Sequence, residues 1–294
     1  IPAVIFSSGG YANHAFHAIA DIIIPLYFTS HEFNGSVMFL VSDFESRCVS
    51  KYGPILERLS DYDLVDLKDD DRVLCFSRVI LGLDSSRPEL GGGPKLFTDH
   101  TMTDFKRFIR DTYSLKRHTV VDPLESPPRL LLISREASRR VENEGEIREM
   151  CERVGFEVDV REIKGEFSSI ARYVNTFDVM VGVHGAGLAN MIFLPENAIV
   201  VQIVPFALDV LSKFFYEFPT RDMKLGYLNY TVAWDETSLS KEYSSDDEVH
   251  TGYRDIVRRS WHEYWTIYML YQNLTLNVSR LEKTISHAIH TLRN

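Results

Sequence analysis

The chain has 294 residues, of which 45% are hydrophobic, and this length exceeds one ordinary domain, so it predicts two. The formal net charge is −10 at pH 7, and the sequence contains no contiguous basic run. Because binding to nucleic-acid phosphates needs clustered Lys and Arg, this composition argues against a nucleic-acid partner.

Along the first part of the chain, short apolar runs alternate with amphipathic segments, a pattern typical of a parallel sheet covered by helices. Thr101 or Thr103 is the expected N-cap of the last of these helices. Residues 121–128 are rich in proline and suit an extended connection between domains. In chain order we expect a strand at 3–7, a turn at Gly9 and Gly10, a helix at 13–29, a strand at 37–42, a helix at 51–59, a strand at 73–76 and a helix at 102–113.

After this connection the alternation continues and predicts a second Rossmann-like unit. The polar residues 235–247 indicate a loop, and the tail 260–292 is expected to be largely helical. The predicted fold class is therefore α/β, with an N-terminal domain over residues 1–122 and a C-terminal domain over residues 123–294. The elements expected here are a strand at 129–134, a helix at 144–154, a strand at 157–162, a helix at 168–175, a strand at 178–183, a short helix at 188–194 and a strand at 199–204.

A glycine-spaced loop follows the expected strand at 178–183 and passes directly into a helix. The carboxyl ends of parallel strands and the first amides of helices both favour anions. Gly185 and Gly187 let the backbone approach a phosphate, and His184 can donate a hydrogen bond to it. The simpler interpretation is a tight turn beside a buried structural histidine. The predicted anion site comprises His184, Gly185, Ala186, Gly187, Leu188 and Asn190.

A second group of polar side chains follows the expected strand at 129–134. Ser134 and Arg135 come directly after that strand, and Arg139 and Arg140 lie in the same turn. Arginine binds diphosphate oxygens in a bidentate manner and keeps its charge, so this turn suits a nucleotide diphosphate. The alternative is a solvated basic turn.

The first expected helix carries a third candidate site. Asn13, His17 and Asp21 recur every four residues, which places them on one helix face. A carboxylate beside a histidine orients the ring and makes it a better base, as proton abstraction from a hydroxyl requires. The alternative is a solvated polar face. We predict His17 and Asp21 as the catalytic residues, with Gly10, Tyr11 and Asn13 beside them.

Outside these motifs, no stretch approaches about 18 uninterrupted apolar residues, so none predicts a membrane span. The chain opens at Ile1 within a strand-like segment, and we expect any signal or anchor to lie upstream. Cys48, Cys75 and Cys151 are too scattered for a zinc ribbon or disulfide scaffold. Four Asn-x-Ser/Thr triplets mildly favour a secretory protein, and they predict glycosylation at Asn34, Asn229, Asn273 and Asn277.

Several stretches together resemble the family 61 glycosyltransferases, and the resemblance covers nearly the whole chain. Three further stretches resemble the plant clade that adds pentoses to xylan: Lys51-Tyr-Gly-Pro-Ile-Leu, Arg221-Asp-Met and the residues from Trp261 onward. The family motifs are Gly9-Gly-Tyr-x-x-Asn13-x-x-Phe16-His17-x-x-x-Asp21-x-x-x-Pro25-Leu, Leu132-Ile-Ser-Arg135, Val181-Gly-Val-His-Gly-Ala-Gly-Leu188, Phe193-Leu-Pro195 and Val201-Gln-Ile-Val-Pro205.

This resemblance implies a GT-B fold, in which two Rossmann-like domains face a central cleft, with the last helix able to return to the first domain. It also implies a type II membrane protein of the Golgi lumen, with inversion at the anomeric carbon. The donor would be UDP-xylose or UDP-arabinofuranose and the acceptor xylan. Ala18 departs from the family pattern, which usually has Asp or a related residue there.

The mechanism expected is a single in-line displacement that requires no metal or other cofactor. Ser134, Arg135, Arg139 and the residues from His184 to Asn190 would hold UDP, while His17, assisted or replaced by Asp21, would deprotonate the acceptor hydroxyl held near Gly10, Tyr11 and Asn13. The Asp-x-Asp spacings at Asp61–Asp63 and Asp69–Asp71 have the polar setting of surface loops.

Other interpretations remain open at this stage. The chain could be a non-catalytic sugar- or UDP-binding subunit of a xylan-synthesising complex, or a family 61 transferase acting on another glycan. A dinucleotide-dependent epimerase or dehydrogenase would need Gly-x-Gly-x-x-Gly at its first helix, which Gly9-Gly10 does not provide. Monomer and homodimer are both compatible with the sequence.

Overall fold

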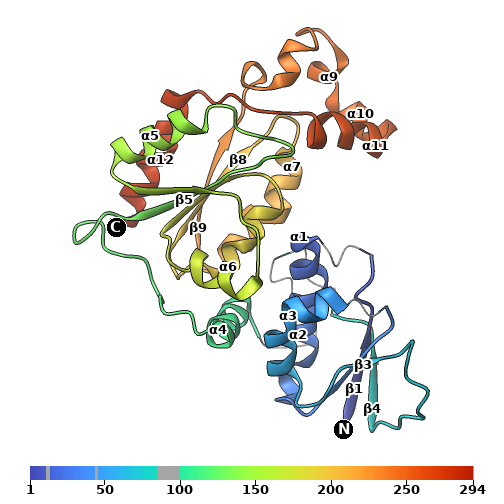
Figure 1. Cartoon of the computed structure of the whole chain (residues 1–294). Coiled ribbons are helices and arrows are strands. Elements are labelled where there is room, and N and C mark those ends of the chain that lie inside the picture. The colour runs from blue at the N-terminus through green and yellow to red at the C-terminus, as the bar shows by residue number, and fades with distance from the viewer. Residues whose placement is uncertain (11–13, 44–45, 85–89, 91–99, 294) are drawn as a thin grey trace. The chain divides into compact units, whose positions relative to one another are not determined.

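The computed structural model describes residues 1–10, 14–43, 46–84, 90 and 100–293. The chain divides into two compact units (Figure 1). Unit 1 comprises Ile1–Lys116 together with Gly165–Arg172, and unit 2 comprises Arg117–Lys164 together with Tyr173–Asn294. The later segment joins unit 1 through aromatic contacts, because the ring of Phe167 packs edge-on against those of Tyr52 and Tyr113, at centroid distances of 4.8 and 5.8 Å.

Unit 1 contains a parallel four-stranded sheet with the strand order β3-β2-β1-β4. The strand expected at residues 73–76 is wrong. Leu74 and Phe76 pack on the sheet, as their alternation indicated, but Val73 is 92% exposed and the strand that pairs with β1 begins at Arg78. β3 was not expected from the sequence. The strands are β1 (Pro2–Phe6), β2 (Met38–Val41), β3 (Val65–Asp66) and β4 (Arg78–Leu81).

The helices of unit 1 follow the expected pattern. Phe16, Ala20, Ile23 and Tyr27 are buried along one face of the first helical segment, which includes a π-helical stretch. The N-cap of α4 is Thr101, which forms a capping box with Asp104. The helical elements are α1 (Ala15–His17), η1 (Ala18–Ile23), α2 (Ile24–Ser30), η2 (His31–Phe33), α3 (Ser46–Leu59) and α4 (Met102–Tyr113).

Unit 2 contains a parallel five-stranded sheet with the order β6-β5-β7-β8-β9. Every residue of β7 and β8 is buried, which explains why their sequences are apolar apart from Gln202 in β8. β9 was not expected, because polar and aromatic residues alternate along it. The strands are β5 (Arg129–Ile133), β6 (Glu157–Arg161), β7 (Val179–Val183), β8 (Ile199–Val204) and β9 (Gly226–Thr231). With two parallel sheets covered by helices, the prediction of an α/β chain with two Rossmann-like units is confirmed.

Helices cover this second sheet, and the last of them, α12, packs against α5, β8 and β9 within unit 2 (Figure 1). The segment expected as a short helix after β7 is a 3-10 helix, and the expected loop at 235–247 contains two 3-10 turns. After β5 the helical elements are α5 (Glu144–Val154), α6 (Phe167–Val174, whose residues up to Arg172 belong to unit 1), η3 (Ala186–Phe193), α7 (Asp209–Ser212), η4 (Lys213–Glu217), α8 (Phe218–Asp222), η5 (Trp234–Glu236), η6 (Ser238–Lys241), α9 (Glu248–Thr251), α10 (Tyr253–Arg259), α11 (Trp261–Tyr264), η7 (Trp265–Leu270) and α12 (Val278–Leu292).

Asp178 fixes the start of unit 2 to its sheet. Its side chain is 0% exposed, directly before β7. The carboxylate accepts hydrogen bonds from the backbone amides of Val121 (2.9 Å) and Arg129 (2.8 Å), and it pairs with the guanidinium of Arg117. One buried carboxylate therefore holds both ends of the proline-rich connection.

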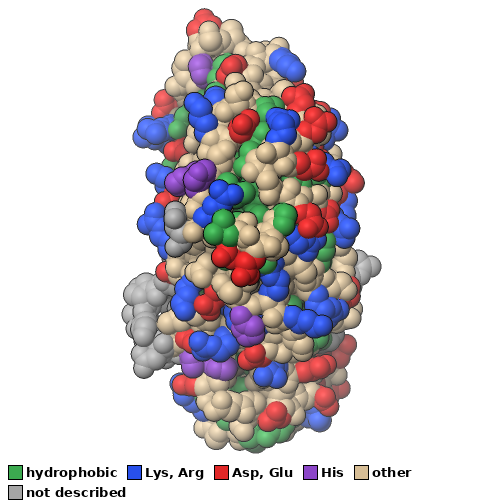
Figure 2. All heavy atoms as spheres, turned by 90° about the vertical axis from the view of Figure 1, so that its left-hand side faces the viewer, with side chains coloured by type: hydrophobic (Ala, Val, Ile, Leu, Met, Phe, Trp, Pro, Cys, Tyr) green, Lys and Arg blue, Asp and Glu red, His purple; other side chains and the backbone are tan. Residues whose placement is uncertain are grey.

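The surface carries charges of both signs. On the face shown in Figure 2, Lys and Arg side chains are interspersed with Asp and Glu side chains. Within the described ranges, the structure has no helix whose length and apolar character would let it span a bilayer.

Candidate functional site

The strand order of unit 2 creates a site at the carboxyl ends of β5 and β7. These two strands are neighbours, but the chain leaves β5 toward β6 on one side and β7 toward β8 on the other. In an open parallel sheet, such a reversal point separates the two connecting loops and leaves a crevice in which ligands bind. Arg135 follows β5 and His184 follows β7, so both predicted groups lie at this point.

Two guanidinium groups converge on the turn after β7. A Cβ atom at Gly185 would lie 2.5 Å from Nη1 of Arg135 and 3.4 Å from Nη2 of Arg139. Gly185 also has a φ of 151°, which side chains disfavour, so two independent constraints require glycine here. The structure thus brings together Arg135, Arg139 and Gly185, which lie far apart in the sequence.

Neither guanidinium forms an ion pair with a carboxylate in the part of the chain that the structure describes. Arg135 donates from Nε to the carbonyl of Ser138 (2.7 Å), and Arg139 donates from Nη1 to Sδ of Met269 (3.1 Å). The Nε atom of Arg139 is buried without a partner. Burial, followed by the charge of Arg135, lowers the pKa of Arg139 to about 10, and burial lowers the pKa of Arg135. An anion between them would compensate this buried positive charge.

The backbone of the turn contributes further donors. The amide of Leu188 is engaged, because it donates to the carbonyl of Gly185 (3.0 Å). Among the described residues, the amides of Gly185, Ala186 and Gly187 have no acceptor. Asn190 stabilises the turn by donating from Nδ2 to the carbonyl of Gly187 (2.9 Å), so its side chain supports the loop.

The turn also packs closely against β5. A Cβ at Gly187 would lie 3.0 Å from Cγ2 of Ile133, and one at Gly182 would lie 3.2 Å from Cδ1 of the same side chain. On the other side, the hydroxyl of Tyr216 donates to the carbonyl of Gly185 (2.7 Å). These contacts fix the backbone amides in place before any ligand arrives.

His184 is buried, with 2% of its surface exposed, and its partners determine its tautomer. The side-chain amide of Gln202 donates to Nδ1 (3.0 Å), since its own oxygen accepts from the hydroxyl of Tyr227 (2.7 Å). Ser212 also lies at Nδ1, at 3.2 Å. With Nδ1 as the acceptor, the proton resides on Nε2, which has no partner among the described residues and can donate to an anion.

The imidazole of His184 stays neutral over the physiological range. Burial, reinforced by the charges of Arg139 and Arg135, lowers its pKa from 6.5 to about 3. In the unfolded chain the ring takes up a proton near pH 6.5, whereas in the folded chain it does not until near pH 3. The free energy of unfolding therefore decreases as the pH falls from 6.5 to 3, because in this range the proton binds His184 only in the unfolded chain.

We predict that Gln202→Glu reverses the tautomer of His184. A carboxylate at this position accepts a proton from Nδ1, which leaves Nε2 as an acceptor that repels phosphate oxygens. The dissociation constant for UDP, the nucleotide that the family resemblance implies, should rise about tenfold at pH 8. It should recover on acidification, because the added carboxylate favours the protonated ring and a proton on Nε2 restores the donor. Calorimetric titration between pH 5 and pH 8 tests this, with Gln202→Met as the control that weakens binding equally at every pH. A flat pH profile for the glutamate variant would contradict the assigned tautomer.

The other predicted residues of this region face elsewhere. The hydroxyl of Ser134 donates to Oε2 of Glu144 (2.9 Å). Arg140 is exposed and pairs with Glu142 (2.9 Å), so its charge is already neutralised. Of the three arginines in this turn, two have no carboxylate partner among the residues that the structure describes, and the third forms a surface ion pair.

In unit 1, the predicted pair of His17 and Asp21 is formed. Nδ1 of His17 lies 2.8 Å from Oδ2 of Asp21, at the junction of α1 and the π-helical stretch. Since a carboxylate accepts the Nδ1 proton, Nε2 is the basic nitrogen of this ring. Gly10 lies in an exposed turn with a φ of 71°. Tyr11 and Asn13 lie outside the described residues.

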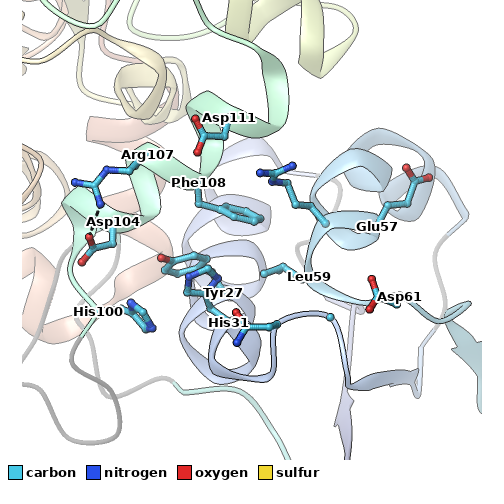
Figure 3. Close-up of a pocket in the computed structure, with 13 residues that line it drawn as sticks. Tyr27, His31, Glu57, Leu59, Asp61, His100, Asp104, Arg107, Phe108 and Asp111 are labelled. Carbon is cyan, nitrogen blue, oxygen red and sulfur yellow. Dashed lines mark hydrogen bonds and ion pairs between the residues drawn. The ribbon is translucent and has the colours of Figure 1, made fainter. Parts of the chain in front are cut away.

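Unit 1 also has a cavity of about 620 Å³, lined by Tyr27 and His31 at the end of the first helical segment (Figure 3). The ring centroids of His31 and His100, two residues of its wall, lie 4.6 Å apart. Arg107 in this wall is already paired with Asp104 (3.0 Å). The unit 2 site differs from this cavity because Arg135 and Arg139 have no carboxylate partner within the described part of the chain.

The Asp-x-Asp pairs lie in exposed loops of unit 1, as their polar setting indicated. Asp61, Asp63, Asp69 and Asp71 are all exposed. Throughout the described ranges, no cluster of three or more His, Cys, Asp or Glu side chains could hold a metal ion.

Three residues that support the site were not identified from the sequence. Gln202 is 0% exposed in the otherwise apolar strand β8, and a buried amide in such a strand is a signal that it has a specific partner. Ser212 and Tyr216 contact His184 and Gly185 from a separate helical segment. No local pattern marks these two, because their contacts depend on the tertiary fold.

The sequence of this chain is similar to that of a known protein family. The model of the family Glycosyltransferase 61 matches residues 16–201. This range includes His17, Asp21, the arginines after β5 and the turn after β7. The match therefore covers the pair of His17 and Asp21 and the site after β5 and β7, but it begins after Gly10, Tyr11 and Asn13.

Curated relatives match over almost the whole chain. The alpha-1,3-arabinosyltransferase XAT2 of Oryza sativa subsp. japonica is 38% identical, over 99% of this chain and 51% of its own length. The beta-1,2-xylosyltransferase XYXT1 of the same organism is 37% identical, over 100% of this chain and 64% of its own. The xylan glycosyltransferase MUCI21 of Arabidopsis thaliana is 33% identical, over 98% and 62%. The chain thus spans between half and two thirds of the length of these relatives.

Proposed function

The chain belongs to the glycosyltransferase 61 family, and we propose that it transfers a pentose, either xylose or arabinofuranose, from a UDP-sugar to the backbone of xylan. The observation that supports this most strongly is the pair of guanidinium groups at Gly185, the buried one of Arg139 and the half-buried one of Arg135, neither of which pairs with a carboxylate among the described residues. They need an anion, and a nucleoside diphosphate is the anion that a glycosyl donor brings.

On the donor side, Arg135 and Arg139 would bind the diphosphate together with the amides of Gly185, Ala186 and Gly187. As the bond to the sugar breaks, negative charge develops on the departing UDP. Positive groups already fixed around that charge lower the barrier, because they need no reorganisation during the reaction. Nε2 of His184 would add a neutral hydrogen bond. We propose that these groups suffice for departure of UDP without a metal or other cofactor.

On the acceptor side, His17 would act as the base, oriented by Asp21, with Gly10, Tyr11 and Asn13 as acceptor-binding residues. A xylan hydroxyl oxygen attacks the anomeric carbon, and its proton passes to Nε2 of His17. The bond between that carbon and the UDP oxygen breaks in the same step, and its electron pair leaves with UDP. One in-line displacement inverts the configuration of the anomeric carbon.

We place this reaction in the Golgi lumen, as part of a type II membrane protein whose anchor lies outside these residues. The names of the relatives include both an arabinosyltransferase and a xylosyltransferase, so both donors have to be tested. We propose that the protein acts either as a monomer or as a homodimer.

The decisive experiment incubates the purified protein with xylo-oligosaccharides and either UDP-xylose or UDP-arabinofuranose, with EDTA present, and reads the acceptor mass. We expect a gain of one pentose unit with one of the donors. A gain that appears only when EDTA is replaced by a divalent cation would contradict the metal-independent mechanism. UDP binding without any transfer would favour another acceptor glycan or a non-catalytic subunit.

A further inference from the structure

The four predicted glycosylation sites differ in their surroundings. Asn34, Asn229 and Asn277 are exposed. Asn273 is half-buried, and its Oδ1 accepts a hydrogen bond from the backbone amide of Arg140 (3.0 Å). Asn277 is the N-cap of α12 and accepts from the amide of Arg280 (3.1 Å). Asn34 and Asn229 are thus the exposed sites whose carbonyl groups hold no element in place.

Asn229 is in an unusual position because it lies within a strand at the edge of a sheet. β9 is the last strand in the order of the second sheet and pairs with β8. Its sequence, Gly-Tyr-Leu-Asn-Tyr-Thr, carries no charge and no proline. Edge strands of this kind tend to pair with strands of other molecules, and proteins generally protect them.

A groove of about 650 Å³ borders this strand. Glu217 and Arg221 line it from the helical segment around α8, while Lys283, Thr284 and His287 line it from α12. Tyr227, Leu228 and Asn229 of β9 complete the lining. These two helices pack against β9, so the groove between them follows the edge of the sheet.

From this arrangement we infer that Asn229 carries an N-linked oligosaccharide whose first sugars lie in this groove and shield the edge of β9. A charged and aromatic lining suits a sugar chain, since aromatic faces and charged side chains contact its apolar faces and its hydroxyls. Covalent attachment at Asn229 delivers the chain directly to the groove.

The modification itself needs a lipid diphosphate-linked oligosaccharide as the donor. Nδ2 of Asn229 forms a bond to the anomeric carbon of the first sugar and loses one proton. The bond from that carbon to the lipid diphosphate breaks, and the diphosphate leaves with the electron pair. The inference rests on the proposed secretory location in this one respect, because such donors are found on that route.

The test expresses the chain behind a cleavable secretion signal in a eukaryotic host, so that it enters the secretory route irrespective of its native location. Glycopeptide mass spectrometry measures the occupancy of Asn229. Size-exclusion chromatography with light scattering measures self-association of Asn229→Gln. The control is Asn34→Gln, which also removes an exposed site that lines a cavity but lies in no strand.

We expect Asn229 to be occupied, and the glutamine variant to show at least about a twofold increase in its self-associated fraction over the control variant. An unoccupied Asn229 would overturn the inference, as would an occupied site whose removal leaves the protein as monodisperse as the control. If Asn229→Gln is not secreted, a variant that retains Asn229 as its one glycosylation site can be deglycosylated after folding and compared in the same way. Pentose transfer is not read in this experiment, so its failure and that of the proposed reaction are distinguishable.

Discussion

Arg139→Gln is expected to raise the dissociation constant for UDP about 100-fold, while the ligand-free protein becomes more stable. The loss of affinity follows from removing a charged hydrogen-bond donor from the proposed diphosphate site. The gain in stability follows because the folded protein buries this guanidinium without a carboxylate among the described residues, at a cost in solvation free energy.

The backbone conformation of Arg139 also indicates that this residue serves binding. Its φ of 54° is in the left-handed region, which residues other than glycine rarely adopt. A strained backbone and a buried unpaired charge at one residue are typical of a position kept for binding rather than for stability.

Calorimetry with UDP and urea unfolding of the ligand-free protein measure the two effects separately. Arg140→Gln is the matched control, because Arg140 is the next residue but forms an exposed ion pair with Glu142. We expect this control to change stability by less than about 1 kcal/mol and to leave UDP binding unchanged. If Arg139→Gln lowers stability and binds UDP normally, the guanidinium is structural and the proposed donor site is wrong.

Asp178→Ala is expected to lower the free energy of unfolding of unit 2 by about 3–5 kcal/mol. The substitution leaves the amides of Val121 and Arg129 without their acceptor and the guanidinium of Arg117 without its counter-charge. Unpaired buried donors and an uncompensated charge are among the largest destabilising changes that one substitution can make.

Chemical denaturation measured by tryptophan fluorescence tests this expectation, since Trp234, Trp261 and Trp265 all lie in unit 2. Asp122→Ala serves as the control: this exposed carboxylate lies in the same connection and accepts one hydrogen bond, from the amide of Leu124 (2.8 Å). We expect Asp122→Ala to lower the free energy of unfolding by less than about 1 kcal/mol. If both variants lose the same free energy of unfolding, Asp178 stabilises the connection no more than an exposed carboxylate does.

The parts of the fold that sequence patterns predict best are the strands buried on both faces. Apart from Arg129 at the start of β5 and Gln202 in β8, the strands β5, β7 and β8 have apolar sequences, because helices cover both faces of a parallel sheet. β9 is an edge strand in which exposed and buried residues mix, so it lacks that signal. The segment 73–76 has the alternation of a strand, since Leu74 and Phe76 do pack on the sheet, yet its backbone does not pair. Periodicity reports which side chains are buried, whereas pairing is decided by the tertiary fold.

The same distinction applies to the candidate site. Arg135 and His184 were predictable because each follows a recognisable strand, and the topology then brings them to one edge. The partner of each arginine was not predictable: Arg139 and Arg140 are adjacent, but one is buried without a carboxylate in the described part of the chain and the other forms a surface ion pair. Tertiary contacts decide which of the two neighbouring arginines is buried without a counter-charge among the described residues. One such contact joins Arg139 to Met269, 130 positions away.

The close packing of the turn after β7 limits how this protein could be redesigned. A side chain at Gly182 would press on Leu188 and Ile133, and one at Gly187 would press on Ile133. A side chain at Gly185 would displace the guanidinium of Arg135. In the proposed donor site, every glycosyl donor that carries a diphosphate contacts this turn in the same way, so a change to the turn is expected to weaken the binding of all of them alike. An engineer who wishes to exchange one transferred sugar for another should therefore randomise positions that reach the sugar ring and leave these three glycines untouched.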